Sequence, residues 1–186
     1  MFLKCIFDIV LSFFSLVMLL PVILLISFLV RIKLGSPVLF SQSRPGLNGK
    51  PFRMIKFRTM TSDIDSDGRL LPDSLRLVPF GAFLRSTSLD ELPQLWSIIT
   101  GYMSFVGPRP ALFNQDDLIA LRTKNGVDML VPGLTGWAQV NGRDELPVSE
   151  KVALDLEYTE RQSFWFDMKI LWLTCLKVIK RDGVSH

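Results

Sequence analysis

The stretch IVLSFFSLVMLLPVILLISFLV, residues 9–30, carries no charge and is dense in leucine, isoleucine, valine and phenylalanine. At about 1.5 Å of rise per residue it is long enough to cross a bilayer as one helix. Pro21 lies near its middle, where it is expected to bend the helix. The chain therefore predicts a membrane element joined to the rest of the protein.

Basic residues flank this apolar run on both sides, with Lys4 before it and Arg31 and Lys33 after it. Lys and Arg mark the cytoplasmic flank of a membrane segment, so a helix that enters, bends at Pro21 and returns to the same face is favoured alongside a true span. The residues themselves do not decide between the two. Lys4 and Asp8 are one helical turn apart and are expected to pair at the interface.

The 186 residues make one domain of ordinary size and at most one appended segment. The net charge of +3 is unevenly placed, because residues 9–62 hold no acidic residue and seven basic ones. Such a block favours anionic lipid headgroups or phosphorylated ligands. Nucleic acid is disfavoured, since no basic helix or aromatic base-stacking pattern is present.

The small number of cysteines and histidines excludes several kinds of catalytic and metal site. Cys5 and Cys175 lie far apart in apolar stretches and make no disulfide framework, so a reducing compartment is the simpler inference. The only histidine is His186. Serine triads, Cys/His dyads and most zinc sites are thereby excluded, which leaves carboxylates as the expected catalytic groups.

The stretch RSTSLDELPQL, residues 85–95, places the adjacent carboxylates of Asp90 and Glu91 where a helix is predicted to begin. Either Asp90 is the N-cap, or Ser88 is the cap and Glu91 completes a capping box. Both registers put Asp90 at a helix N-terminus, which favours its ionised form and attracts phosphate. Acids also occupy first turns with no other role.

Asn48 and Gly49 separate two strand-like runs and predict a tight hairpin turn, because both residues tolerate positive φ. On the second strand, Lys56 and Arg58 alternate onto one face. Two cations on one face form either an anion site or a solvated surface.

Residues 63–68 begin like a calcium loop but do not end like one. The twelfth position, where a bidentate glutamate is needed, is Ser74. This segment is therefore predicted to be a polar, exposed loop.

Arg109 lies between Pro108 and Pro110, so its guanidinium is presented from a stiff loop. Stiffness suits phosphate recognition, although an incidental arginine in a turn explains the motif equally well. Residues 131–143 then hold three glycines and the amides Gln139 and Asn141. These glycines predict close approach of backbone to a ligand, or simply turns.

The helix that begins at the acidic pair is predicted to continue through residues 94–99, with Gly101 as its stop. Three more helices are predicted: residues 116–124, Ser149 to about Arg161, and 164–181. The last has a broad apolar face and a narrow lysine stripe, which fits a helix in the membrane interface; a core-packed helix is the alternative. The apolar face comprises Phe164, Trp165, Met168, Leu171, Trp172, Cys175, Leu176 and Ile179, and the stripe comprises Lys169, Lys177 and Lys180.

Taken together, these motifs resemble the bacterial sugar transferases known as monotopic phosphoglycosyl transferases, in particular the small members that are little more than the catalytic unit. The resemblance covers nearly the whole chain. It rests on Lys4 to Asp8, the apolar run with Pro21, Arg44-Pro45-Gly46, residues 56–60, Arg85 with residues 88–94, residues 107–110, and residues 132–136 through Asn141-Gly142-Arg143.

The resemblance implies an α/β-associated fold in three parts. Residues 1–33 form a re-entrant membrane helix-break-helix, and residues 34–160 form a compact, mainly helical catalytic domain with a small β-hairpin. Residues 161–186 form a C-terminal interfacial amphipathic helix and tail. The chain departs from the family at Leu20, often a serine, and at Val131, often a basic residue.

The resemblance also implies the reaction: a phosphosugar passes from a UDP-sugar to polyprenol phosphate, and UMP is released with the help of Mg²⁺. Asp90 is the expected nucleophile and metal contact, and Glu91 either binds the metal or assists the lipid phosphate. The expected substrate and phosphate contacts are Lys56, Arg58, Arg85, Arg109, Gln139, Asn141 and Arg143.

The implied location is the bacterial inner membrane, with the site on the cytoplasmic face among membrane lipids. A homodimer is left open, and the sugar is not indicated. Two rival functions remain at this point: a membrane-anchored module that binds anionic lipid without catalysis, and a metal-dependent UDP-sugar hydrolase.

Overall fold

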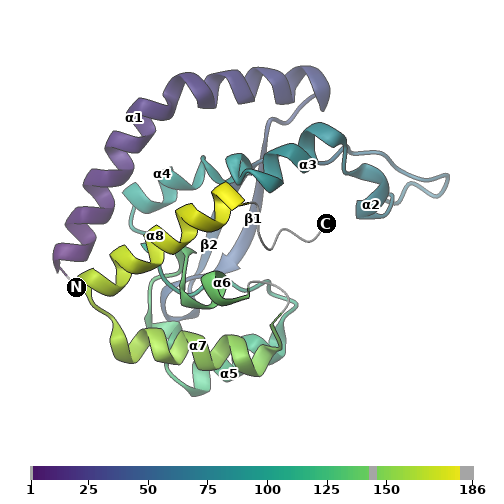
Figure 1. The fold of residues 1–186 in the computed structure, drawn as a ribbon. Helices are drawn as coiled ribbons and strands as arrows, with labels where there is room; N and C mark the ends of the chain where they lie inside the picture. Colours follow the sequence, from purple (N-terminus) through teal and green to yellow (C-terminus); the bar gives the residue numbers. More distant parts are fainter. Residues whose placement is uncertain (1, 143–145, 181–186) are drawn as a thin grey trace.

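The computed structural model of the protein describes residues 2–142 and 146–180 (Figure 1). Within these ranges the chain is mostly helical, with two small two-stranded sheets. The prediction of a mainly helical domain with a small β-hairpin is therefore confirmed. The elements are α1 (Phe2–Lys33), β1 (Leu39–Pro45), η1 (Leu47–Gly49), β2 (Pro51–Phe57), α2 (Asp73–Arg76), α3 (Pro79–Ser86), η2 (Leu89–Glu91), α4 (Gln94–Ile99), β3 (Ser104–Val106), α5 (Asp116–Lys124), η3 (Val127–Met129), β4 (Gly133–Thr135), α6 (Trp137–Asn141), α7 (Val148–Arg161) and α8 (Phe164–Lys180).

Helix α1 runs from Phe2 to Lys33 as one element with Pro21 inside it. Figure 1 shows it as an arc around one side of the molecule. Proline lacks an N–H and crowds the preceding turn, which bends a helix without necessarily ending it. The predicted helix-break-helix is therefore corrected to one bent helix.

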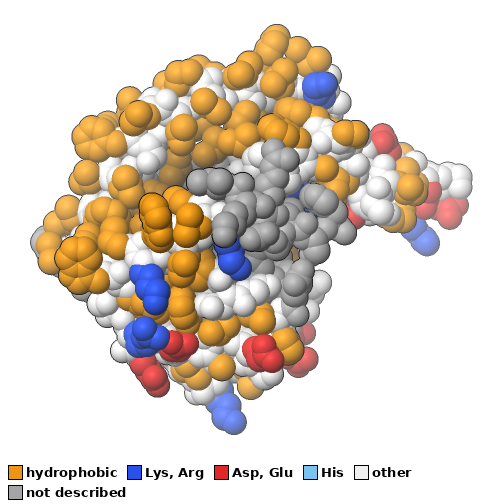
Figure 2. All heavy atoms as spheres, in the orientation of Figure 1, with side chains coloured by type: hydrophobic (Ala, Val, Ile, Leu, Met, Phe, Trp, Pro, Cys, Tyr) orange, Lys and Arg blue, Asp and Glu red, His pale blue; other side chains and the backbone are white. Residues whose placement is uncertain are grey.

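Most of the apolar surface of α1 is bare, and the span Leu3–Lys33 is long and apolar enough to cross a membrane. Figure 2 shows hydrophobic side chains gathered along its arc. One face of the helix is covered: Leu11, Leu16 and Leu19 pack against the main core, and Ile26 and Val30 are only 5% and 0% exposed. Ile26 and Val30 pack in one cluster with Phe57 and Leu84 of the domain.

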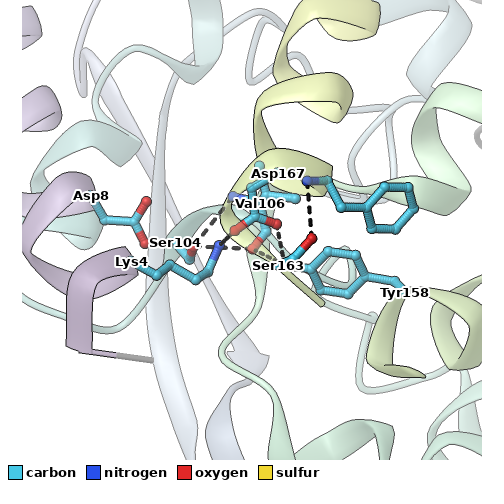
Figure 3. A network of polar contacts seen from close by, with 8 residues as sticks. Lys4, Asp8, Ser104, Val106, Tyr158, Ser163 and Asp167 are labelled. Carbon is cyan, nitrogen blue, oxygen red and sulfur yellow. Dashed lines mark hydrogen bonds and ion pairs between the residues drawn. The ribbon is translucent and has the colours of Figure 1, made fainter. Parts of the chain in front are cut away.

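The N-terminal end of α1 is held by a buried polar network (Figure 3). Lys4 Nζ lies 2.6 Å from Asp167 Oδ2 on α8, and Ser104 Oγ on β3 lies 2.7 Å from Asp8 Oδ2. The Tyr158 hydroxyl donates to Asp167 Oδ1 at 2.8 Å. The predicted pairing of Lys4 with Asp8 is therefore wrong, because α8 and β3 offer each of them a buried partner.

Strands β1 and β2 pair antiparallel, with Leu39 opposite Phe57 and Pro45 opposite Pro51. Asn48 and Gly49 adopt φ of 54° and 70°, so the predicted positive φ at both positions is confirmed. The connection between the strands includes η1 and is longer than the predicted tight turn. A proline at the end of each strand removes a ladder donor, which ends the pairing there.

Strands β3 and β4 form a short parallel pair, with Ser104 opposite Gly133. A Cβ atom added to Gly107 would lie 2.4 Å from the Val131 carbonyl oxygen, and one added to Gly136 would lie 2.1 Å from that of Gly107. The glycines here thus let two segments of the chain cross in direct contact. This backbone crossing accounts for them without a ligand.

The bounds of α5 and the end of α4 agree with the prediction, and Gly101 follows α4 with φ of 79°, as a helix stop does. Helix α4 begins at Gln94, later than predicted, because Leu89–Glu91 form the separate 3₁₀ turn η2. Helix α7 begins at Val148 with Pro147 as its N-cap. Ser149 is therefore inside the helix, and its predicted capping role is wrong. Proline at the cap position pre-sets the entry φ without needing a side-chain cap.

Helix α8 buries a face that its sequence pattern does not single out. Phe166, Asp167 and Ile170 are 6%, 4% and 0% exposed, and Phe166 and Ile170 pack into the main core. Trp165 and Trp172, on the predicted broad apolar face, are 79% and 65% exposed. The core-packed alternative is thus confirmed for one face of α8, while a position of the bare aromatic face in a membrane interface stays a prediction.

We expect Asp167→Asn to lower the free energy of unfolding by about 3 kcal/mol, because it leaves the Lys4 ammonium without its carboxylate in a poorly hydrated site. Urea unfolding in detergent micelles measures this. Asp73→Asn is the matched control: its carboxylate, 74% exposed, pairs with Arg76 at the surface, and its loss should cost under about 1 kcal/mol. Equal losses would contradict a tether at Lys4.

Candidate active site

A cavity of about 490 Å³ lies among the β-hairpin, η2, α4, β4, α6 and α8. It brings together residues that are far apart in the sequence, from Phe40 on β1 to Val178 on α8. Six of the predicted site residues line it: Lys56, Arg85, Asp90, Glu91, Arg109 and Gln139.

The two acids lie on the 3₁₀ turn η2, which is entered through Ser88 in the left-handed conformation, with φ of 55°. Ser88 makes no side-chain cap, and α4 begins only at Gln94. Both predicted capping registers are therefore wrong. Within this tight turn the two consecutive carboxylates lie in different surroundings.

Asp90 is 7% exposed, and its burial raises the pKa of its carboxyl to about 6. Lys56 and Arg85 lower that pKa, and the neighbouring Glu91 raises it. Within the described residues, no side chain pairs with the Asp90 carboxylate. It is therefore ionised at neutral pH without a direct cationic partner, which is the condition of a nucleophile rather than of a structural ion pair.

Glu91 is neutralised by neighbouring cations. Its Oε1 lies 2.6 Å from Lys56 Nζ and 3.5 Å from Arg109 Nη2, and both members of the pair with Lys56 have side chains 18% exposed. The sequence places two equivalent acids side by side, whereas the fold pairs one and leaves the other unpaired.

Two further arginines face the cavity from fixed positions. Arg85, in the last turn of α3, donates from Nε to Thr59 Oγ1 at 3.0 Å. Arg44 on β1 donates from Nη1 to the Pro110 carbonyl at 3.2 Å and from Nη2 to Gln42 at 2.8 Å. Each arginine is thus oriented before a ligand arrives, which reduces the entropy lost on binding.

The loop that carries Arg109 is anchored from behind by Arg122. The Nη1 atom of Arg122 donates to the Arg109 carbonyl at 2.7 Å, while its Nε and Nη2 atoms donate to Asp155 at 2.9 and 2.6 Å. Arg122 and Asp155 are 9% and 1% exposed. These contacts hold the backbone at Arg109, as a stiff loop requires, and the role of Arg109 in phosphate recognition stays a prediction. The anchor itself has no signal in the sequence, because 33 residues separate its two members.

Gln139, on α6, is 6% exposed and lines the cavity. Neither its Nε2 nor its Oε1 atom has a hydrogen-bond partner among the described residues. Buried amides are normally paired, so this one offers an unused donor and an unused acceptor to a ligand.

Two other predicted contacts lie elsewhere. Arg58 is 8% exposed, donates to the Ser36 carbonyl at 2.9 Å, and is not among the cavity-lining residues. It follows the end of β2, so its alternation with Lys56 breaks there. Asn141 donates to the Trp137 carbonyl at 2.7 Å and is exposed on α6. Arg143 lies outside the described residues.

Sequence reasoning missed the contribution of α8 to the cavity. Lys177, predicted on an interfacial stripe, lines the cavity together with Thr174. Thr135 Oγ1 and Thr174 Oγ1 lie 2.7 Å apart and join β4 to α8. The period of a helix shows which residues share a face but not which neighbour that face meets.

The Asp63 to Asp67 segment is exposed, as predicted, and the Asp65 carboxylate accepts the backbone N–H groups of Asp67 and Arg69 at 2.9 Å. Among the residues that the structure describes, no three Asp, Glu, His or Cys side chains gather as a metal site. Mg²⁺ needs only one or two carboxylates when substrate phosphates complete its shell. Asp90, buried and unpaired in the described part of the chain, fits that requirement.

Comparison with known proteins identifies the family. The chain is 46% identical over 188 residues to an uncharacterized sugar transferase, EpsL, of Bacillus subtilis, which covers all of this chain and 92% of the relative. It is 40% identical over 180 residues to the UDP-glucose:undecaprenyl-phosphate glucose-1-phosphate transferase of Escherichia coli, which covers 91% of this chain and 39% of that protein.

A third relative is the undecaprenyl-phosphate galactose phosphotransferase of Salmonella typhimurium, 34% identical over 203 residues, which covers 98% of this chain and 41% of that protein. The chain thus spans about two fifths of the length of these two named transferases. A family model described as bacterial sugar transferase matches residues 1–181. The match runs from the membrane helix through the acidic turn to α8, and the chain belongs to the bacterial sugar transferase family.

Proposed function

We propose that this protein transfers a phosphosugar from a UDP-sugar to polyprenol phosphate and releases UMP, with Asp90 as a covalent nucleophile. The observation that carries the proposal is the buried, unpaired Asp90 carboxylate in a cavity that also holds Lys56, Arg85 and Arg109. The names of the relatives support the donor and acceptor classes, because they specify UDP-glucose and undecaprenyl phosphate.

The reaction divides into two displacements at one phosphorus atom. An Oδ atom of Asp90 attacks the phosphorus that carries the sugar, and the bond from that phosphorus to the bridging oxygen breaks. The electron pair stays on this oxygen, which leaves as part of UMP. A phosphate oxygen of polyprenol phosphate then attacks the same phosphorus, which releases the Asp90 carboxylate and forms the lipid diphosphosugar.

The cations of the cavity make the first displacement feasible, because a carboxylate and a diphosphate repel one another. Lys56, Arg85 and Arg109 neutralise the phosphates, and Gln139 supplies a donor and an acceptor to the polar part of the donor substrate. Bound Mg²⁺ would contribute further charge neutralisation at the diphosphate. Glu91, already paired with Lys56, holds that lysine in position and faces the acceptor phosphate in the second step.

We further propose that α1 is re-entrant and that the site faces the cytoplasm at the bacterial inner membrane. Both ends of α1 contact the same domain: Lys4 pairs with Asp167, and Lys33 lies over the Phe80 ring at 5.7 Å. A spanning helix would separate its ends by about 30 Å of hydrocarbon, which one domain could not bridge. The exposed Trp165 and Trp172 of α8 suit the adjacent interface.

A topology experiment tests this arrangement. In a variant with Cys5→Ser and Cys175→Ser, a cysteine at position 3 should react with a membrane-impermeant maleimide only after the cells are permeabilised. Asp67→Cys, in an exposed loop of the domain, is the control and should behave identically. Labelling at position 3 in intact cells would establish a true span.

The covalent step predicts a partial reaction without the lipid. With UDP-sugar and Mg²⁺ alone, labelled UMP should exchange into UDP-sugar, and the protein mass should rise by one phosphosugar on the peptide that contains Asp90. Asp90→Asn should abolish both signals, because a neutral amide is a poor nucleophile. Glu91→Gln should still form the adduct, which then persists when lipid is added.

Exchange that strictly requires polyprenol phosphate would overturn the covalent mechanism. Turnover by Asp90→Asn at the wild-type rate would also overturn it. Release of free phosphosugar in the absence of any lipid would instead identify a hydrolase.

The raised pKa of Asp90 predicts how activity and stability change with pH. Exchange should increase as pH rises through about 6, where the carboxylate ionises, and should level off above that pH. The folded state favours the protonated carboxyl of Asp90, so the ionised carboxylate lowers the free energy of unfolding above about pH 6. Asp90→Asn removes this charge and should stabilise the metal-free protein at pH 8 by about 2 kcal/mol. The gain should be smaller at pH 5. Glu91→Gln, which breaks a pair, should not stabilise, and thermal unfolding with EDTA present compares the two.

A further inference from the structure

One wall of the cavity is a single face of α8. Leu171, Thr174, Cys175 and Val178 all line the cavity, and their spacing of three, four and seven residues places them on one side of the helix. Apart from the hydroxyl of Thr174, this face is apolar. It stands in the same cavity as the acids and cations of the hairpin and of η2.

Other elements extend the apolar wall. Leu95, Phe105, Leu134 and Val140 line the same cavity, and each is buried or half-buried. The cavity therefore has a charged part, with Lys56, Arg85 and Arg109, and an apolar part. A ligand that fills both is an amphiphile with an anionic head.

The donor does not account for the apolar part. A UDP-sugar is a uracil, two sugars and a diphosphate, and each of these groups carries hydrogen-bonding or charged atoms. The apolar surface of such a ligand is limited to the faces of its rings, and its polar edges would be desolvated against an extended apolar wall. The acceptor differs, because its phosphate is joined directly to a branched hydrocarbon chain.

We propose that the α8 face formed by Leu171, Cys175 and Val178 binds the first isoprene units of the polyprenol phosphate acceptor. This inference rests on the proposed function. In this arrangement the acceptor phosphate lies near Lys56 and Arg109, within reach of the phosphosugar that is bound to Asp90. Lys177, on the same helix and also lining the cavity, provides a further cation on the acceptor side.

Two features fit α8 for this role. Thr174, in the middle of the face, is joined to Thr135 of β4 by a hydroxyl contact of 2.7 Å, which fixes the helix against the cavity. Trp165 and Trp172, elsewhere on the same helix, are exposed. Hydrophobic side chains also gather over the end of α8 near the N-terminus and along α1 (Figure 2). The helix thus joins the bare apolar surface to the cavity.

The first test uses Cys175 as a reporter that does not require turnover. In Cys5→Ser it is the only cysteine of the chain, and it is exposed within the cavity wall. Undecaprenyl phosphate at about ten times its Kd should slow modification of Cys175 by N-ethylmaleimide about tenfold. Inorganic phosphate at the same concentration should have no effect. Equal rates with both compounds would overturn the proposal.

The second test separates acceptor from donor. Leu171→Gln should raise the KM for undecaprenyl phosphate about tenfold, while the exchange of UMP into UDP-sugar changes far less. Leu121→Gln on α5 is the matched control, because Leu121 is partly exposed and is not among the cavity-lining residues; both measurements should remain as in wild type. Thermal unfolding of each variant checks that the fold is retained.

An equal loss of exchange and transfer in Leu171→Gln would assign the wall to the donor and overturn the proposal. An unchanged KM would do so as well. If the wild-type protein turns over no UDP-sugar at all, the proposed function fails, whereas protection of Cys175 still reports whether the acceptor binds. The two failures are therefore distinguishable.

Discussion

The unpaired charge of Asp90 is the constraint on which the site depends. A buried carboxylate without a cation is costly, so it must be held by a fold that gains stability elsewhere. Here the nearby cations are committed to other partners: Lys56 to Glu91, and Arg85 to Thr59. Their fields still reach Asp90 and lower its pKa against the effect of burial. The carboxylate remains available because its neighbours are occupied.

The loop that carries Arg109, opposite the acids, is likewise positioned by polar groups that are paired with one another. Arg122 uses its guanidinium to hold Asp155 and the Arg109 carbonyl together, so Arg109 projects toward Glu91 from a backbone that cannot shift freely. Gly107 lies against Gly136 directly after the paired strands β3 and β4, which fixes the other side of the loop. Binding energy is then available for the ligand, because little of it is needed to order the protein.

Helix α1 contacts the domain that carries this site at both of its ends. The Lys4 to Asp167 pair closes one end, and the burial of Val30 beside Leu84 closes the other. Pro21 lies inside the helix, which curves around one side of the molecule and exposes a broad apolar surface. A domain tied to both ends of α1 holds the cavity at a fixed position relative to that surface.

Much of this protein could be predicted from local pattern alone. The apolar run with Pro21, the hairpin around Asn48, the end of α4, the bounds of α5, and the grouping of Asp90 with Glu91 all follow from composition, turn chemistry and period, which depend on neighbouring residues. The family also follows from the order of the motifs.

Tertiary structure alone decided which of two adjacent acids is paired, and that Arg58 turns away from the cavity while Lys177 turns into it. It also decided that Lys4 meets Asp167 rather than Asp8. Each of these outcomes depends on a contact between residues distant in the chain. Such contacts depend on how the helices and strands pack together. A local sequence pattern does not show which distant residue a side chain will contact.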